Sequence, residues 1–121
     1  MKYNFNISKE VNPLVPKFNL AFLEFFEELK SQVGFETNSH QSSELRMDAV
    51  SGMYTEGVFE YNNDYDRKSK VSFIPRFDGT CDIKWQFKGM NSGRPDNSWE
   101  EKTVSIIKIW EKVPEIKDFF T

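Results

Sequence analysis

The chain has 121 residues, one cysteine and a formal net charge of −3. A chain of this length normally forms one domain and buries roughly two thirds of the surface that its unfolded form exposes. We therefore expect a single domain over residues 1–121. Twelve phenylalanines raise the aromatic fraction to 16%, so the core should be built mainly from large rings.

The composition argues against several classes of protein. A lone cysteine, Cys81, forms no internal disulfide, and secreted chains of this size more often carry paired cysteines, so we expect a cytoplasmic protein. Residues 1–10 lack the apolar run of a signal peptide, and no stretch approaches the roughly 20 apolar residues that span a bilayer. Residues 1–60 carry 5 Lys and Arg against 9 Asp and Glu, which argues against nucleic acid as the partner.

The first part of the chain predicts a strand, a helix and a polar loop. Residues 1–10 alternate polar and apolar side chains, which is the pattern of a half-buried strand. Residues 17–33 place their apolar side chains on one face of a helix, and Gly34 stands where a C-terminal cap belongs. The polar stretch 36–43 predicts a loop, and residues 44–50 predict a short helical turn.

The middle of the chain predicts a three-stranded meander. Residues 53–61 predict a strand with a bulge at Gly57. Residues 70–77 and 81–88 alternate strictly, and Asp78 and Gly79 between them predict a hairpin with a type I′ turn. Pro75 supplies no N–H to a ladder, so its strand should lie at a sheet edge or be bulged. In this pattern Cys81 faces inward and is a buried, inert thiol.

The last third of the chain predicts a helix. Ser98 and Glu101 have the spacing of a capping box, and Ile106, Ile109 and Trp110 share one arc of a helical wheel. A strand through residues 103–110 is the alternative, because β-branched residues are frequent there. Pro114 ends or kinks the predicted helix. The predicted fold is α+β, with an antiparallel sheet of about four strands in the order strand, helix, loop, three-strand meander, helix, and with the helices packed on one face.

The sequence offers few groups for catalysis or metal binding. His40 is the only histidine, and it lies in a predicted loop without the glycine-framed elbow that positions a nucleophile. It is 41 positions from the only cysteine, which excludes a structural zinc site. The glycines are scattered and form no phosphate-binding motif. We therefore expect no enzymatic activity, no metal and no cofactor.

Three surfaces remain as candidates for recognition. The first is the acidic face of the predicted helix 17–33, because complementary charge steers association. The second is the lysine-bearing outward face of the hairpin, for which a solvated sheet face is the preferred interpretation. The third comprises the loops after residues 61 and 89, because Tyr, Trp and Arg are enriched in binding hot spots. The residues predicted to bind a partner are Glu24, Glu27, Glu28, Asp64, Tyr65, Asp66, Arg94 and Trp99.

These features favour a non-enzymatic domain that binds another protein. The leading hypothesis is a stoichiometric inhibitor, such as a toxin immunity protein or a viral anti-defence protein, whose partner is a basic toxin or nuclease. The alternative is a small-ligand-binding domain with an aromatic pocket between sheet and helices. Its lining would be Phe59, Phe73, Trp85 and Phe87. Size weighs against this alternative, because a chain this short leaves little volume beyond its core. The sequence leaves the oligomeric state open.

Overall fold

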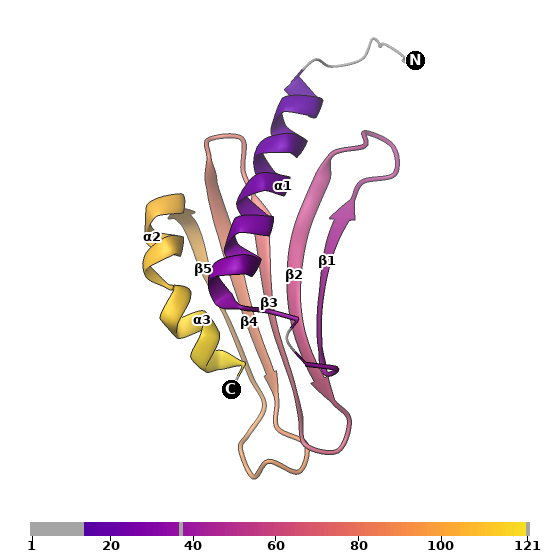
Figure 1. Ribbon diagram of the computed structural model, residues 1–121, viewed down its shortest axis with the longest axis vertical. Coiled ribbons are helices and arrows are strands. Elements are labelled where there is room, and N and C mark those ends of the chain that lie inside the picture. Colours follow the sequence, from indigo (N-terminus) through magenta and orange to yellow (C-terminus); the bar gives the residue numbers. More distant parts are fainter. Residues whose placement is uncertain (1–13, 37, 121) are drawn as a thin grey trace.

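The described residues form a five-stranded antiparallel sheet with three helices on one face (Figure 1). The computed structural model describes residues 14–36 and 38–120, so the predicted strand over residues 1–10 lies outside the described residues. The strands follow one another in the order β1-β2-β3-β4-β5. The elements are α1 (Leu14–Val33), β1 (Gln41–Met47), β2 (Tyr54–Asn63), β3 (Arg67–Pro75), β4 (Thr80–Lys88), β5 (Asn97–Ser105), α2 (Ile106–Glu111) and α3 (Val113–Phe119).

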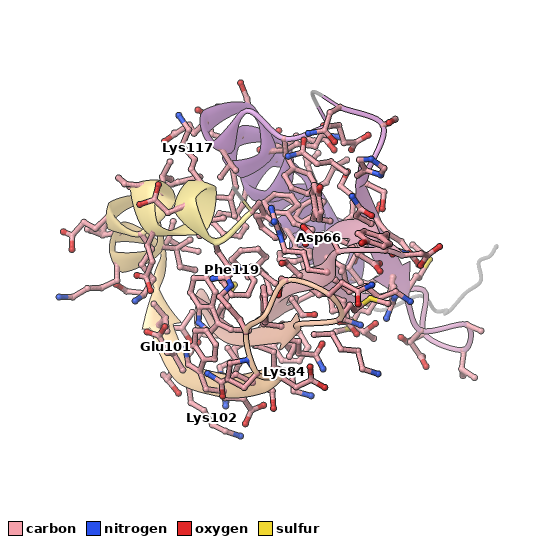
Figure 2. The ribbon with its side chains drawn as sticks, turned by 90° about the horizontal axis from the view of Figure 1, so that it is seen from below. Asp66, Lys84, Glu101, Lys102, Lys117 and Phe119 are labelled. Carbon is pink, nitrogen blue, oxygen red and sulfur yellow. The ribbon has the colours of Figure 1, made fainter. Side chains whose placement is uncertain are left out.

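The α+β class and the antiparallel sheet are confirmed, and the described residues alone form five strands where about four were predicted for the whole chain. Seen from below, the helices lie on one side of the sheet with Lys117, and Lys84 lies on the open side (Figure 2). The sheet therefore has two faces, one covered by helices and one open. None of the helices in the described residues combines the length and apolar character that crossing a bilayer requires.

Helix α1 confirms the prediction over residues 17–33 and begins slightly earlier. Phe22, Phe26, Leu29 and Val33 are buried, at the spacing that lines one helix face. The helix ends at Val33, and Gly34, which follows it, has a positive φ of 70°. The N–H groups of Gly34 and Phe35 donate to the Lys30 carbonyl at 3.0 and 3.1 Å, which gives this carbonyl of the last helical turn its hydrogen-bond partners.

The core is a layer of aromatic rings between α1 and the sheet, and Gly57 makes room for it. The Phe59 ring centroid lies 4.9 Å from that of Phe26 and 5.6 Å from that of Phe73. A Cβ on Gly57 would lie 2.6 Å from ring atoms of Phe26. Gly57 pairs regularly with both neighbouring strands, so the predicted bulge there is wrong, and the irregularity falls where Met47 pairs with Tyr54.

Residues 41–47 form the edge strand β1, so the predicted helical turn over residues 44–50 is wrong. Only Leu45 and Met47 are apolar in this strand, which hides its β character in the sequence. Seven residue pairs with β2 hold it in place. Backbone pairing along the β2 edge thus determines this segment more than its own side chains do.

The β3–β4 hairpin is confirmed, but its turn is not type I′. Within this turn only Gly79 has a positive φ, of 86°, whereas type I′ needs two such residues. The Gly79 N–H donates to the Arg76 carbonyl at 3.2 Å and the Arg76 N–H to the Thr80 carbonyl at 2.9 Å, which describes a three-residue turn. Pro75 ends the central strand β3, so the edge prediction is wrong. The last residue of β3 that pairs with β2 is Phe73, opposite Gly57. Pro75 lies beyond this pair, so β2 needs no backbone N–H group from it.

Residues 97–105 form strand β5, so the predicted capping box at Ser98 and Glu101 is wrong. Trp99 stacks on Trp85 of β4 with centroids 5.6 Å apart, and the Trp85 indole N–H donates to Glu101 at 2.9 Å. The helix begins later, at Ile106. The segment 103–110 is therefore strand in its first part and helix in its second.

Short helices α2 and α3 close the fold. The Lys108 N–H donates to the Ser105 hydroxyl, which caps α2. Pro114 lies in the first turn of α3, where its missing N–H costs nothing, so the chain kinks there as predicted. Ile116 and Phe120 are buried and fix α3 to the core.

A bulge in β5 is held by Asp82 of β4. Pairing shifts between Cys81 and Ile83, and Thr103 opposite has a positive φ of 56°. The Asp82 carboxylate accepts from the Thr103 N–H at 2.9 Å and from the Arg76 guanidinium at 2.9 and 3.1 Å. These donors, the Arg76 guanidinium first, lower the pKa of the Asp82 carboxyl from its ordinary value.

We predict that Gly57→Ala lowers the free energy of unfolding by about 1–3 kcal/mol, because the new methyl group forces the buried Phe26 ring to move. Urea denaturation measures the change. Thr55→Ala, at an exposed position of the same strand, is the control and should stay within about 0.5 kcal/mol. A Gly57→Ala effect no larger than that of the control would contradict close packing at this point.

We predict that Asp82→Asn destabilises the protein at neutral pH and that this difference disappears in acid. The folded protein holds the pKa of Asp82 below its ordinary value, so the ionised form contributes stability above about pH 4. That contribution is lost as pH falls through the lowered pKa. Thermal unfolding of both proteins between pH 7 and pH 2 measures the difference, and a pH-independent gap would contradict the prediction.

Candidate functional site

Two loops predicted separately from the sequence meet at one end of the sheet. They are the β2–β3 turn, residues 64–66, and the β4–β5 loop, residues 89–96, both at the bottom of Figure 1. The Asn91 N–H donates to the Asp66 carbonyl at 3.1 Å, and its side-chain amide donates to the Tyr65 carbonyl at 2.6 Å. We call these two loops together the tip.

The β2–β3 side of the tip is ordered by Asn63. Its side-chain oxygen accepts from the N–H groups of Tyr65 and Asp66 at 3.1 and 3.3 Å, which shapes the turn. The Asp66 carboxylate pairs with the Arg67 guanidinium at 2.9 Å, and that guanidinium lies 4.6 Å from the centroid of the Tyr61 ring. Asp66 therefore supports the turn, whereas Tyr65 is left to face solvent.

The β4–β5 side of the tip is ordered in a similar way. The Gly89 N–H donates to the Asp96 carboxylate at 2.8 Å, and the Ser92 N–H donates to the Gly89 carbonyl at 2.7 Å. The Arg94 guanidinium lies 4.3 Å from the centroid of the Phe87 ring, a cation–π contact. Met90 is held at a positive φ of 44°, which is rare for a side chain of this size.

The tip displays large side chains to solvent. Tyr65 is 78% exposed and Met90 is 47% exposed. The exposed carboxylate of Asp64 and the guanidinium of Arg94 border them, the first pairing with Lys68 at 3.5 Å. The tip therefore brings together four of the predicted partner-binding residues, Asp64, Tyr65, Asp66 and Arg94. Sequence reasoning did not select Met90 or Asn91, since a methionine and an asparagine in a glycine-containing loop carry no distinctive signal.

The predicted acidic residues Glu24, Glu27 and Glu28 lie elsewhere, on the exposed side of α1. Lys30 pairs with Glu27 at 3.5 Å, and the Gln32 amide donates to Glu28 at 3.0 Å. Helix α1 covers the middle of the sheet, and the tip lies beyond its C-terminal end (Figure 1). No ion pair or hydrogen bond joins the two regions among residues 14–36 and 38–120.

Trp99 supports the core and also shows one edge to solvent. Its ring stacks on the fully buried Trp85 and meets Phe119 edge-on at 5.9 Å, and 39% of the residue is exposed. The Lys112 ammonium pairs with Glu101 at 2.7 Å next to this contact. Trp99 thus covers the rim of the core on β5.

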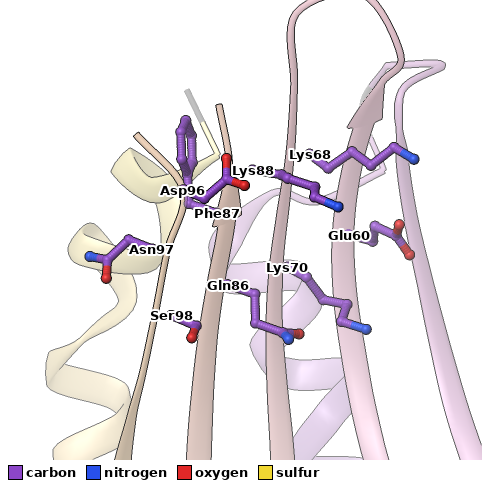
Figure 3. Close-up of a pocket in the computed structure, with 9 residues that line it drawn as sticks. All are labelled: Glu60, Lys68, Lys70, Gln86, Phe87, Lys88, Asp96, Asn97 and Ser98. Atoms are coloured by element: carbon purple, nitrogen blue, oxygen red, sulfur yellow. The ribbon is translucent and has the colours of Figure 1, made fainter. Parts of the chain in front are cut away.

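A polar groove of about 590 Å³ crosses the open face of the sheet near the tip (Figure 3). Lys68 and Lys88 are direct cross-strand neighbours, and like charges in that position repel. Lys70 faces Glu60 across β2 and β3, and Glu60 lies near the ends of Lys68 and Lys70 in Figure 3. Three lysines and two carboxylates line the groove, so positive and negative charges nearly balance. This is typical of an ordinary solvated sheet face and not of a phosphate-binding surface.

We predict that Asn91→Ala separates the two loops of the tip without unfolding the protein. The substitution removes the side-chain hydrogen bond to the Tyr65 carbonyl, so amides 64–66 and 90–94 should exchange with solvent faster while core amides keep their protection. Hydrogen exchange followed by NMR measures both. Asn62→Ala, at an exposed strand position, is the control, and unchanged exchange at the tip would show that Asn91 does not join the loops.

His40 and Cys81 lie in different surroundings in the described part of the chain. His40 is exposed, with its ring 5.6 Å from that of Tyr61, and burial raises the pKa of the Cys81 thiol to about 12. In the same part of the chain, no three His, Cys, Asp or Glu side chains are grouped so as to hold a metal ion. Comparison with known proteins adds no assignment: no protein-family model, curated protein or solved structure matches this chain.

Proposed function

We propose that this chain is a non-enzymatic domain that binds another protein through its tip. The observation that carries the proposal is the pair of hydrogen bonds from Asn91, which joins two loops into one ordered surface that exposes Tyr65 and Met90. An ordered surface loses less conformational entropy on binding than a free loop. Large exposed side chains on a rigid scaffold are the usual anchors of such interfaces.

The form of binding that we propose is stoichiometric inhibition, as by a toxin immunity protein or a viral anti-defence protein. The support is the charge of the molecule, a net −3, and the exposed carboxylates Glu24, Glu27 and Glu28 on α1. An acidic protein is steered toward a basic partner, such as a toxin or nuclease that acts on nucleic acid. A cytoplasmic location fits this role and belongs to the same proposal.

The rival function, a ligand pocket on the aromatic face of the sheet, finds less support at the residues first considered. Phe59, Phe73 and Trp85 are fully buried against other rings, so this part of the interface is filled. Phe87 carries the Arg94 guanidinium and lines the polar groove on the open face, so it does not contribute to a pocket between sheet and helices. A different cavity lies at the other end of the sheet, between the first turns of α1 and the β3–β4 turn.

We predict that Tyr65→Ala with Met90→Ala weakens binding of the partner at least tenfold, because two exposed anchors are removed. The partner is first captured from a lysate of the source organism and purified, and its affinity is then measured by calorimetry, with the 1:1 ratio checked by native mass spectrometry. Val50→Ala is the matched control, since Val50 is 96% exposed in the β1–β2 turn at the opposite end.

A second variant separates steering from contact. Reversing the charges of Glu24, Glu27 and Glu28 to lysine should slow association at low salt and leave dissociation nearly unchanged. An affinity that survives both the tip variant and this charge reversal would contradict the proposed function.

A further inference from the structure

An open apolar cleft lies at the end of the sheet opposite the tip. It has a volume of about 660 Å³ and is bounded by the first turns of α1, the β3–β4 turn and the start of α2. Its principal apolar walls are Phe18, Phe22, Phe25, Pro75, Phe77 and Ile106. The nine-residue strands β3 and β4 separate it from the tip, so the two sites share no loop.

The walls of this cleft include rings that the core does not cover. Phe77 is 76% exposed, and its centroid lies 5.1 Å from that of the half-buried Phe18. At the floor, Cys81 is only 2% exposed, and burial keeps its thiol neutral, so it adds apolar surface. Removing such surface from water is favourable, so the cleft suits an apolar group.

Among the described residues, the charged side chains that line the cleft are both basic. They are Lys17 and Arg76, and no carboxylate from the described part of the chain lines the cleft. The Arg76 guanidinium is occupied by Asp82, with contacts at 2.9 and 3.1 Å. Lys17 is exposed and has no ion pair within the described ranges of the chain. An occupant with an apolar body and one anionic group would therefore complement both the walls and the rim.

The volume of the cleft indicates the size of molecule that it can hold. A cleft of about 660 Å³ falls within the roughly 300–1,000 Å³ of typical small-molecule sites. We propose that this cleft binds a small amphipathic anion of the fatty-acid class, with its hydrocarbon chain against Phe18, Phe22 and Phe25 and its carboxylate at Lys17. This site is independent of the proposed protein-binding tip, and either can fail without the other.

The test is calorimetric titration of the full chain with sodium dodecanoate below its micelle concentration. Saturable 1:1 binding is expected, with an affinity that falls about fourfold for each methylene removed from the chain. Dodecyltrimethylammonium has the same tail and the opposite charge, so it should bind at least tenfold more weakly. Equal affinity for the two ions, or no saturable binding of dodecanoate, would overturn the proposal.

Substitutions then locate the site. Lys17→Met should weaken dodecanoate binding about tenfold, whereas Lys102→Met on β5 should leave it unchanged. Ala21→Trp should abolish binding, because Ala21 is an exposed lining residue whose enlargement fills the cleft without entering the core. Phe77→Ser provides a second variant at an exposed position if Ala21→Trp fails to fold. Binding that survives both Ala21→Trp and Phe77→Ser would overturn the assignment.

Other occupants give different results in the same experiments. If Phe5→Ser with Ile7→Ser creates dodecanoate binding that the unmodified chain lacks, the occupant is the chain's own N-terminal segment and the proposal is overturned. If sedimentation shows a dimer that Ala21→Trp dissociates, the cleft is a contact between two copies, which also overturns it. A monomer whose dodecanoate-induced NMR shifts cluster at Phe18, Phe77 and Ile106 supports it.

Discussion

The structure depends on the layer of aromatic rings packed between the sheet and helices α1 and α3. The Phe59 ring lies at its centre, with centroids 4.9 Å from Phe26, 4.9 Å from Phe35 and 5.6 Å from Phe73. Each ring buries a large area, so a small number of residues fills a wide, flat gap. Close packing of this kind leaves no space for a Cβ at Gly57. The middle of the molecule is filled, and the two surfaces proposed for binding lie at the ends of the sheet.

The sequence predicted the elements whose own side chains face this layer, and it failed where pairing with a neighbour decides the structure. Helix α1 and the β3–β4 hairpin carry clear periodicity and were correct. The edge strands β1 and β5 are mostly polar, and both were predicted as helix in part. In β5, Glu101 has capping-box spacing from Ser98, yet it accepts the indole N–H of Trp85, sixteen residues away. Local spacing cannot reveal a contact of that range.

The candidate site was predictable in its residue types and not in its assembly. Tyr65 and Arg94 were selected because such side chains are frequent in interfaces, and both lie on the tip. Asn91 joins their loops by donating to backbone carbonyls of the other loop. Every residue has a backbone carbonyl, so the sequence does not identify such an acceptor. Trp99 was selected for the same reason as Tyr65, but the parallel Trp85 ring and Phe119 hold it at the rim of the core. The residue type alone does not distinguish a side chain that could anchor a partner from one that covers the rim of the core.

The positions of the tip and the cleft follow from the same strands. Strands β3 and β4 have nine residues each, which at about 3.3 Å per residue separates their ends by roughly 30 Å. Between those ends Val71, Phe73, Ile83 and Trp85 are wholly or almost wholly buried, so this part of the sheet is a rigid spacer. Energetic coupling between distant sites requires an element with two discrete arrangements, and a close-packed ring layer disfavours a second one. Occupancy of the proposed cleft site should therefore leave affinity at the proposed tip site unchanged, because the scaffold between them keeps one arrangement.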